Sequence, residues 1–447
     1  MPTGRVAAGA AAVLVACACV AAPRCAAAAG FSNPQQQDLW YIAYELETFP
    51  QSSLLIHPGE LPRFKAYAKG IIAQAASPLP EWRYLLLAND LVQWFDDVHT
   101  NILGTLLAPA VLHRDALPLV FYWTADGLVA IPTSSTPSLL HLGDEVLAIG
   151  GLSVLQLQAE LRRFIPGSLY GKEQIAARLL STGVFLRWLG VVSAGGRIAM
   201  RLERADGRRY DVTLQLAAPT DLQPYLQAST AFKNAFLAAL PHWTASSTAG
   251  EYRWGIDPAG HYAVMQLMEC VDNSFLWSGM HAFFQAVAAR GVPNVVLDLR
   301  GNPGGYYSII GDLLQYLPHP SPLLWYGNAM PVPESGTVPA PVFHGHLYVL
   351  IDGGTASAAV MTADTLRANH LATLVGTPTG EAPDLRTAMD FQAPATGLAG
   401  EASVGSILLA PAQSEAGALA PDVGLPLTVQ DVRQGVNPVA RWLAGLQ

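Results

Sequence analysis

Two apolar runs that end in small-residue turns carry the residue types that could do chemistry. The first is V-V-L-D-L-R-G-N-P-G-G, from Val295 to Gly305, and the second is L-Y-V-L-I-D-G-G-T-A-S-A-A, from Leu347 to Ala359. Each has the pattern of a buried parallel strand that delivers a loop at its carboxyl end. Ser357 stands between two alanines, so a substrate carbonyl can approach it closely. Glycines in the first turn free backbone N–H groups to face a developing oxyanion. The pattern predicts a serine hydrolase.

A serine nucleophile needs a base at neutral pH, and the chain restricts the choice. The lysines are Lys65, Lys69, Lys172 and Lys233. Since none lies in or after the two turns, the base must be a histidine or a lysine from another part of the chain. Among eleven histidines, His99 is favoured because it stands in the compact polar turn D-V-H-T after a predicted helix. His370, at another helix end, is the alternative, and either histidine could instead cap a helix or face solvent.

The base in turn needs a group that orients it, and a carboxylate at a strand end suits an imidazole. Glu415 is favoured because it follows an apolar run, Ile407 to Pro411. Asp422 is more typical of a turn. Asp298 and Arg300 lie beside the glycine turn, where we expect them to brace the loop rather than to perform chemistry.

Composition describes a globular chain of more than one domain. With 447 residues, 51% hydrophobic and 13% charged, it can form two or three domains. The net charge is −9 and no dense basic cluster occurs, which argues against nucleic-acid binding.

The first 29 residues have the pattern of a cleaved signal peptide. Arg5 precedes the apolar run Val6 to Ala22, and Ala27 and Ala29 form an A-x-A cleavage pattern. The sequence therefore predicts an exported protein, located in the periplasm, the cell envelope or the medium. Leu14 to Cys17 also resembles a lipobox, so membrane attachment is expected only if Cys17 is lipidated. An uncleaved anchor is disfavoured because the run is short and Ala-rich.

The positions of the cysteines predict no internal disulfide and a structural role for the remaining thiol. Three of the four cysteines, Cys17, Cys19 and Cys25, lie in the signal segment, so the mature chain keeps Cys270 alone. No internal disulfide can then form. We expect Cys270 to be a buried structural thiol rather than a nucleophile, because no catalytic motif surrounds it.

The order of predicted elements divides the chain into successive regions. The predicted helices are 38–47, 61–76, 81–95, 154–164, 222–240, 274–290, 306–317 and 357–369. The predicted strands are 128–131, 146–149, 197–203, 209–214, 262–268, 295–299, 347–351 and 374–375. Alternation of strands and helices after residue 261 predicts an α/β fold with a mostly parallel sheet. The expected regions are a signal peptide (1–29), an N-terminal helical region (30–108), a β-rich module (109–216), a linker or arch (217–260) and a catalytic core (261–447).

Several motifs occur together in an order that resembles one protein family. They are D-V-H-T (97–100), G-D-E-V-L-A-I-G-G (143–151), D-L-R-G-N-P-G-G (298–305), G-T-A-S-A-A (354–359), G-x-P-T-G (376–380) and E-A-G-A-L-A-P-D-V (415–423). The combination resembles the carboxyl-terminal processing, or tail-specific, serine proteases over residues 35 to 440. The 143–151 segment with the following helix resembles a PDZ domain, which takes extended peptides by strand addition.

The resemblance implies a crotonase/ClpP-like catalytic core, an inserted PDZ-like module and a serine endopeptidase, which the signal segment predicts to be exported. It further implies polypeptide substrates as partners, with no cofactor and no metal, and it leaves the oligomeric state open. One branch of the family uses a lysine about two dozen residues after the serine, where this chain reads G-E-A-P-D-L-R, so it is similar to the other, histidine-using branch of the tricorn core protease. By motif, that branch implies a triad of Ser357, His99 and Glu415. The oxyanion donors would be the N–H groups of Ala358 and Gly304.

Two departures and two alternatives accompany this interpretation. Val98 stands where tricorn-like sequences have a helper serine, and Glu381 is an unusual acid near the active turn. The alternative is a non-catalytic protein on the same scaffold that binds peptides or apolar ligands. An esterase with the same triad is a further alternative.

Overall fold

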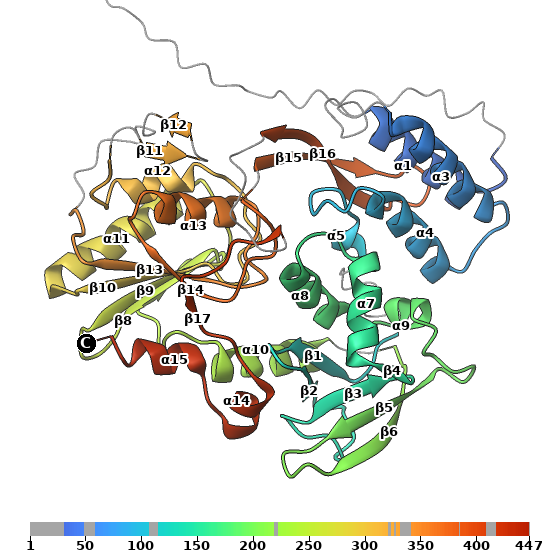
Figure 1. The fold of residues 1–447 in the computed structure, drawn as a ribbon, viewed down its shortest axis with the longest axis horizontal. Coiled ribbons are helices and arrows are strands. Elements are labelled where there is room, and N and C mark those ends of the chain that lie inside the picture. Colours follow the sequence, from blue (N-terminus) through green and yellow to red (C-terminus); the bar gives the residue numbers. More distant parts are fainter. Residues whose placement is uncertain are drawn as a thin grey trace, which may run out of the picture.

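The computed structural model of the chain describes residues 31–48, 59–106, 115–218, 222–320, 323–325, 328–330, 341–383, 385–407 and 417–446, and every structural statement below concerns these residues. The predicted signal peptide and Glu415 lie outside them. Figure 1 shows two lobes, an α/β lobe on the left and a lobe of helices and an antiparallel sheet on the right.

The N-terminal region is helical, as predicted. Its helices are α1 (Pro34–Thr48), α3 (Leu61–Gln74), α4 (Glu81–Gln93) and the single turn α5 (Leu103–Leu106). Proline precedes α4, and apolar residues recur on one face of each long helix, which is the pattern that buries a helix against its neighbours. Leu39, Phe64 and Leu91 come from the three long helices and are fully buried in one shared core.

The β-rich region forms one antiparallel sheet of order β1-β2-β3-β5-β6, with β4 paired to β3. Its strands are β1 (Leu119–Trp123), β2 (Leu128–Pro132), β3 (Glu145–Ile149), β4 (Leu152–Ser153), β5 (Arg197–Glu203) and β6 (Arg209–Gln215). Along β5, Ile198, Met200 and Leu202 alternate into the core. Helix α7 (Val154–Phe164) begins at a capping box between Ser153 and Gln156. Strands β2, β3, β5 and β6 and helix α7 match the predictions, whereas β1 and β4 were not predicted.

Two helices that follow α7 are absent from the predicted elements. They are α8 (Leu169–Leu179) and α9 (Gly183–Trp188), each begun by a hydroxyl cap from Ser168 or Thr182. Helix α10 (Gln223–Phe236) then leads from this lobe to the α/β lobe, and it is shorter than predicted.

The α/β lobe contains a sheet of order β17-β14-β13-β10-β9-β8-β7. Its strands are β7 (Ala245–Ser246), β8 (Tyr252–Ile256), β9 (Tyr262–Leu267), β10 (Asn294–Asp298), β13 (His346–Ile351), β14 (Thr373–Gly376) and β17 (Val423–Gly424). Neighbours from β17 to β9 are parallel, whereas β8 and β7 are antiparallel. The prediction of a mixed α/β fold with a mostly parallel sheet is confirmed.

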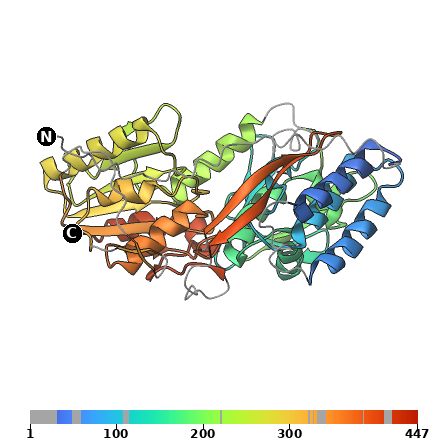
Figure 2. The same ribbon diagram turned by 90° about the horizontal axis from the view of Figure 1, so that it is seen from above.

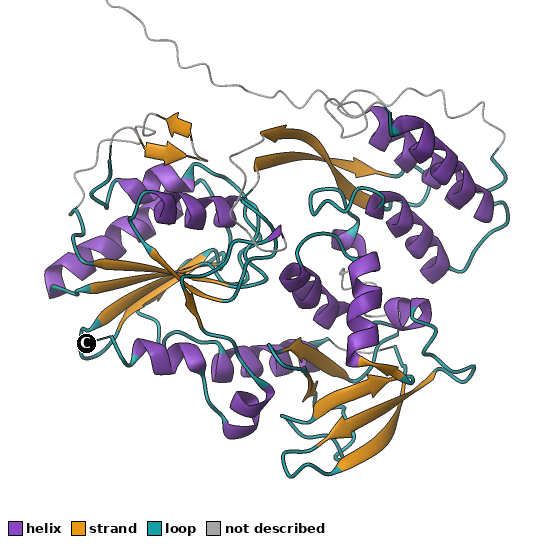
Figure 3. Ribbon diagram, in the orientation of Figure 1, coloured by secondary structure: helices purple, strands orange, loops and turns teal. Residues whose placement is uncertain are grey.

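Helices cover both faces of this sheet (Figure 3). One face packs against α11 (Ser274–Arg290), α12 (Ile309–Leu314) and α13 (Ala358–Ala368). The other packs against α15 (Pro438–Leu443), which follows α14 (Val429–Gln434). Val295 and Leu297 face the first layer and Val296 the second, which is why β10 reads as a continuous apolar run.

The predicted helix 306–317 is wrong at its start. Helix α12 begins only at Ile309. The N–H of Tyr306 donates instead to the carbonyl of Cys270 at 2.6 Å, so the residues after the glycine turn pair with the neighbouring segment before the helix can begin.

A long hairpin connects the two lobes. Its strands are β15 (Leu385–Gln392) and β16 (Ala399–Ile407), and Figures 1 and 2 show it crossing from the α/β lobe to the N-terminal helices. The buried carboxylate of Asp38 accepts the N–H groups of Ala395 at 2.9 Å and Thr396 at 2.6 Å at the hairpin end. Asn101 pairs with Glu401 on β16. The hairpin therefore holds the N-terminal region against the α/β lobe.

Two short strands, β11 (Leu323–Trp325) and β12 (Asn328–Met330), complete the described elements. Within the described ranges, no helix has the length and apolar character required to cross a bilayer.

Candidate active site

Ser357 occupies the turn between β13 and α13, at the N-cap position of that helix. Its backbone angles are φ 50° and ψ −127°, a region that non-glycine residues rarely adopt. Hydrogen bonds hold the turn on both sides: Thr355 Oγ1 donates to the Leu299 carbonyl at 2.9 Å, and the Ala356 N–H donates to the Asn302 carbonyl at 2.9 Å. A serine on a sharp strand-to-helix turn is typical of a nucleophile.

A buried ion pair braces the neighbouring glycine turn, as the sequence predicted. Arg300 donates to both carboxylate oxygens of Asp298, at 2.8 and 2.7 Å, and to the Leu237 carbonyl at 2.7 Å. Burial alone would lower the pKa of Arg300, but the carboxylates of Asp298 and Asp352 outweigh it and raise that pKa. The guanidinium therefore stays charged and holds the glycine turn in place through these hydrogen bonds.

Asp352 ties the two turns to each other. Its Oδ1 accepts the N–H groups of Gly301 at 2.8 Å and Gly354 at 2.9 Å, one from each turn. Burial raises the pKa of Asp352, and these two N–H groups together with Arg300 partly offset that effect. The serine turn and the glycine turn are thus fixed as one unit.

Gly304 contacts the nucleophile directly. Its φ is +101°, and a Cβ placed there would collide with Cβ of Ser357 and lie 2.9 Å from the Ala358 nitrogen. The predicted oxyanion donors Gly304 and Ala358 therefore adjoin Ser357. However, the Gly304 N–H donates to Asn302 Oδ1 at 2.8 Å. Its predicted role requires that bond to open, and it stays a prediction.

His99 is held in a compact turn after α4. Asp97 Oδ1 accepts the His99 N–H at 3.1 Å, and Asp97 Oδ2 accepts the Thr100 hydroxyl at 2.9 Å. At the base of the turn, Lys172 on α8 donates to Asp96 Oδ1 at 3.1 Å and to the Arg162 carbonyl at 3.0 Å. A lysine from another part of the chain is the other type of base that the sequence allows, but buried Lys172 braces the His99 turn instead.

The fold brings His99 to the nucleophile. Nε2 of His99 lies 3.3 Å from Oγ of Ser357, and the His99 side chain is 14% exposed. His370, the alternative base, is exposed at the far end of α13, whose eleven residues span about 16 Å at 1.5 Å per residue. Of the two histidines, only His99 reaches Ser357.

Glu381 also enters the site, although the sequence analysis gave it no role. Its Oε1 accepts the backbone N–H of Ser357, and its Oε2 lies 3.7 Å from Nδ1 of His99. The residue is 6% exposed. The signal that could have found it is its position directly after the G-x-P-T-G segment. Glu415, the predicted orienting acid, lies outside the described residues.

The N-terminal end of α8 packs beneath these site segments. Ser168 donates its hydroxyl to the Thr379 carbonyl at 2.8 Å and its N–H to the Gly380 carbonyl at 3.1 Å. A Cβ on Gly167 would meet Val98, and one on Gly353 would meet the Tyr170 carbonyl. The antiparallel-sheet region therefore contacts the segments that carry His99, Glu381 and Ser357.

Cys270 lies buried beside the glycine turn. It is 1% exposed, and its Sγ lies 3.7 Å from Asn302 Oδ1. Burial raises its pKa to about 12, so it carries no thiolate at neutral pH. The expectation of a buried thiol is confirmed, and its burial favours a structural role over a nucleophilic one.

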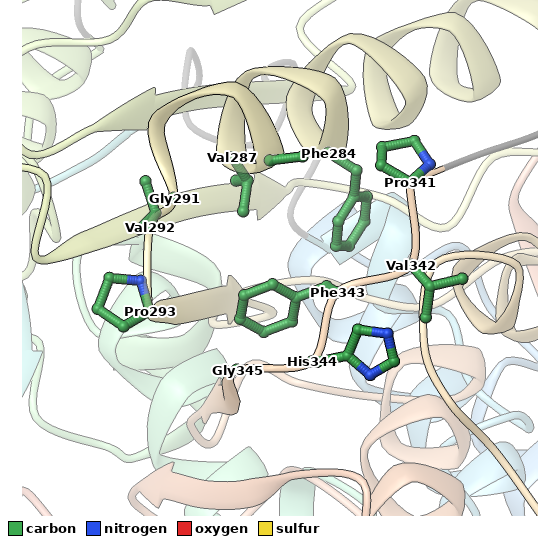
Figure 4. Close-up of a pocket in the computed structure, with 11 residues that line it drawn as sticks. Phe284, Val287, Gly291, Val292, Pro293, Pro341, Val342, Phe343, His344 and Gly345 are labelled. Atoms are coloured by element: carbon green, nitrogen blue, oxygen red, sulfur yellow. The ribbon is translucent and has the colours of Figure 1, made fainter.

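A hollow of about 260 Å³ lies elsewhere in the α/β lobe (Figure 4). Apolar side chains dominate its lining, with Phe284 and Val287 from α11, Val292 before β10, and Phe343 before β13. These residues precede their strands, whereas Ser357 follows the carboxyl end of β13. The six residues of β13 span about 20 Å at 3.3 Å per residue, so the hollow is separate from the site. No cluster of His, Cys, Asp or Glu within the described ranges could hold a metal ion.

Part of the chain is similar in sequence to a known peptidase family. Residues 272–421, which include both turns and Glu381, match the sequence model of peptidase family S41. No curated protein matches the chain.

Solved structures of CPAF share the fold. Mature CPAF complexed with lactacystin matches with a TM-score of 0.65 at 17% identity, over 92% of this chain and 97% of that one. Mature CPAF alone matches with a TM-score of 0.62 at 16% identity, over 92% and 95%. The photosystem II D1 C-terminal processing protease gives a TM-score of 0.39 at 16% identity, over 92% and 99%.

Proposed function

We propose that the protein is a serine-type peptidase of family S41, the family whose sequence model matches residues 272–421, and that it is an endopeptidase for unfolded or extended chains. In this proposal Ser357 is the nucleophile, His99 is the base, and a glutamate orients His99, as in the histidine-using branch of the family. The observation that carries the proposal is the 3.3 Å approach of His99 Nε2 to Oγ of a serine in a strained turn at a helix N-terminus.

The proposed reaction follows from these positions. His99 Nε2 accepts the Ser357 hydroxyl proton as Oγ attacks the peptide carbonyl, and the imidazolium then donates that proton to the leaving amine. The N–H groups of Ala358 and Gly304 bind the tetrahedral oxyanion, and each such donor contributes roughly 3–4 kcal/mol in hydrolases. Water, activated by the same histidine, releases the acyl group from Ser357.

Two regional assignments belong to the same proposal. The α/β lobe is a crotonase/ClpP-like core, supported by its parallel strands and by a serine at the carboxyl end of β13. The antiparallel sheet with α7 is a PDZ-like module, supported by the 143–151 motif and by the strand order. We assign it the capture of an extended substrate segment.

Export is the third part of the proposal, and it rests on the first 29 residues. Expression of the full chain in a bacterial host, followed by fractionation and N-terminal sequencing, tests it. A periplasmic or secreted product that begins near Gly30 supports a cleaved signal. A membrane-bound product that begins at a lipidated Cys17 supports a lipoprotein, and a cytosolic product with an intact N-terminus overturns export.

The experiment that tests the function compares wild type with Ser357→Ala on fluorescently labelled casein, an unfolded protein. We expect hydrolysis to disappear in the variant while the melting temperature changes by no more than about one or two degrees. Ser278→Ala, which removes an exposed hydroxyl on α11, is the matched control and should keep full activity. Unchanged casein turnover in Ser357→Ala would contradict the proposal.

A further inference from the structure

Glu381 bridges the main chain of one proposed catalytic residue and the side chain of the other. One carboxylate oxygen accepts the Ser357 N–H, and the other lies 3.7 Å from His99 Nδ1. We propose that Glu381 is a positioning residue of the peptidase reaction, which fixes the Ser357 turn and orients the His99 imidazole. This inference rests on the proposed function, in which Ser357 and His99 carry the chemistry.

The first role concerns the backbone of Ser357. A non-glycine residue at φ 50° and ψ −127° costs of order 1–3 kcal/mol, so the surroundings must hold it in place. Gly304 presses on one side of Ser357, and Glu381 accepts its N–H. An anionic acceptor makes a hydrogen bond about twice as strong as a neutral one. Glu381 is therefore well suited to hold the nucleophile in its strained turn.

The second role concerns the tautomer of His99. A carboxylate beside Nδ1 favours the form that carries its proton there, which leaves the Nε2 lone pair free to accept the Ser357 proton. The same negative charge stabilises the imidazolium formed during attack. At 3.7 Å the contact is an ion-pair distance, and it shortens to a hydrogen bond with a small movement of either side chain.

Glu381 can perform these roles because its own backbone is fixed. The Glu381 carbonyl accepts the Thr379 hydroxyl at 2.7 Å, and the Gly380 N–H donates to the Thr355 carbonyl at 3.0 Å. From α8, Ser168 holds the carbonyls of Thr379 and Gly380. The segment therefore has supports from the serine turn and from the second lobe.

The other charged groups around the His99 turn make contacts that shape the turn. Asp97 Oδ1 lies 4.0 Å from His99 Nδ1, but its oxygens accept the His99 N–H and the Thr100 hydroxyl, so it shapes the turn. Lys172 and Asp96 pair at the base of the turn. On β16, Glu401 accepts Asn101 Nδ2 at 2.6 Å. Among these groups, Glu381 faces both His99 and Ser357.

The test uses Glu381→Gln, because glutamine keeps the size and one oxygen acceptor for the Ser357 N–H but removes the charge that faces His99. The measured quantity is the rate constant at which a fluorophosphonate labels the mature enzyme, followed across pH. This readout does not depend on knowing the natural substrate. Glu251→Gln is the matched control, because Glu251 is a partly buried glutamate that accepts a side-chain hydrogen bond from Asn273 and lies outside the site.

We expect Glu381→Gln to be labelled about 10–100-fold more slowly than wild type at the optimum, less than the roughly 10²–10⁴-fold that a general base itself contributes. Its acidic limb should move to lower pH, because the imidazole loses a negative charge that favours its protonated form. The control should match wild type in both respects. A Glu381→Gln profile that coincides with the control in rate and in acidic limb would overturn the proposal.

A second variant covers the case in which the glutamine variant folds poorly. Glu381→Ala opens space for an external carboxylate, so added formate should restore part of the labelling rate, and chloride at equal ionic strength should not. Absence of rescue in folded Glu381→Ala would count against a positioning role. Glu415→Gln is measured in parallel: an acidic limb that moves only in that variant assigns the orientation of His99 to Glu415 and overturns the proposal.

The measurements distinguish an error in the role of Glu381 from an error in the proposed function. If Ser357→Ala abolishes labelling and casein hydrolysis but Glu381→Gln behaves as the control, only the role of Glu381 is wrong. If Ser357→Ala keeps its activity, the function itself is wrong.

Discussion

Nε2 of His99 lies 3.3 Å from Oγ of Ser357, although 258 residues separate the two in the chain. His99 follows an N-terminal helix, and Ser357 follows a strand of the other lobe. The hairpin β15–β16 and helix α8 contact both regions and hold the two residues at this separation. The site is thus assembled between lobes, and contacts far from the reacting atoms are expected to affect its activity.

Removal of the base tests this pairing. His99→Ala should lower casein hydrolysis by about 10²–10⁴, the range for a general base, because Ser357 then has no group to accept its proton. His370→Ala is the control, since His370 is exposed at the other end of α13. Steady-state hydrolysis rates on folded protein measure the effect. Equal activity of the two variants would contradict the assignment of His99.

The close approach of Gly304 to Ser357 gives a second prediction. Gly304→Ala places a Cβ against Cβ of Ser357, so we expect fluorophosphonate labelling to fall by about 100-fold, as for a misplaced reacting group. Gly250→Ala carries a similar backbone penalty, because φ is +78°, but a Cβ there meets no atom within 4 Å. If both variants are labelled at the wild-type rate, the close contact between Gly304 and Ser357 is not needed for the reactivity of Ser357.

The ion pair between buried Lys172 and exposed Asp96 gives a third prediction. Lys172→Met removes the brace beneath the His99 turn, and we expect kcat/KM for casein to fall about tenfold, because small displacements of a catalytic group are costly. Lys65→Met removes a surface pair with Glu47, and it should leave kcat/KM unchanged. A tenfold loss in neither variant would show that α8 does not position the turn.

Asp312 gives a prediction for stability against pH. Burial raises its pKa to about 6, above the ordinary value of 3.8, although Trp277 donates a hydrogen bond to it. Folding therefore favours the protonated carboxyl, and this contribution is present below the ordinary pKa and is lost as pH rises through about 6. Asp312→Asn keeps its stability as pH rises, because asparagine has no carboxyl group to ionise.

The variant should match wild type in the free energy of unfolding near pH 4 and exceed it by about 1 kcal/mol near pH 7. Urea titrations at both pH values measure the difference. Asp206→Asn, in the exposed turn between β5 and β6, should change neither value. A variant that is less stable than wild type near pH 7 would reverse the expected sign.

Much of the fold could be predicted because the signals are local. The apolar runs of β10 and β13 and the amphipathic spacing of α4, α7 and α11 fix each element within the segment itself. The segment that forms α8 and α9 shows weak periodicity, and its position depends on Lys172 and on contacts with site segments that lie far away in sequence. The start of α12 was misplaced for the same reason, since the pairing of Tyr306 with Cys270 is a tertiary contact.

The candidate site divides in the same way. Ser357 and the glycine turn stand in recognisable motifs, and His99 stands in a turn whose acid and hydroxyl neighbours suggested a held imidazole. Glu381 has only a weak local signal, its position directly after the G-x-P-T-G segment, because its role depends on the backbone of Ser357 and the ring of His99. Sequence reasoning placed the orienting acid at Glu415, outside the described residues, and that assignment stays a prediction.

Identification of the labelled residue tests the central claim most directly. The mature protein is treated with a fluorophosphonate, digested, and mapped by mass spectrometry, with heat-denatured protein and Ser357→Ala as controls. We predict a single adduct on Ser357 in the native protein and none in either control. An adduct on another residue, or a native protein that hydrolyses casein without any adduct on Ser357, would contradict the account.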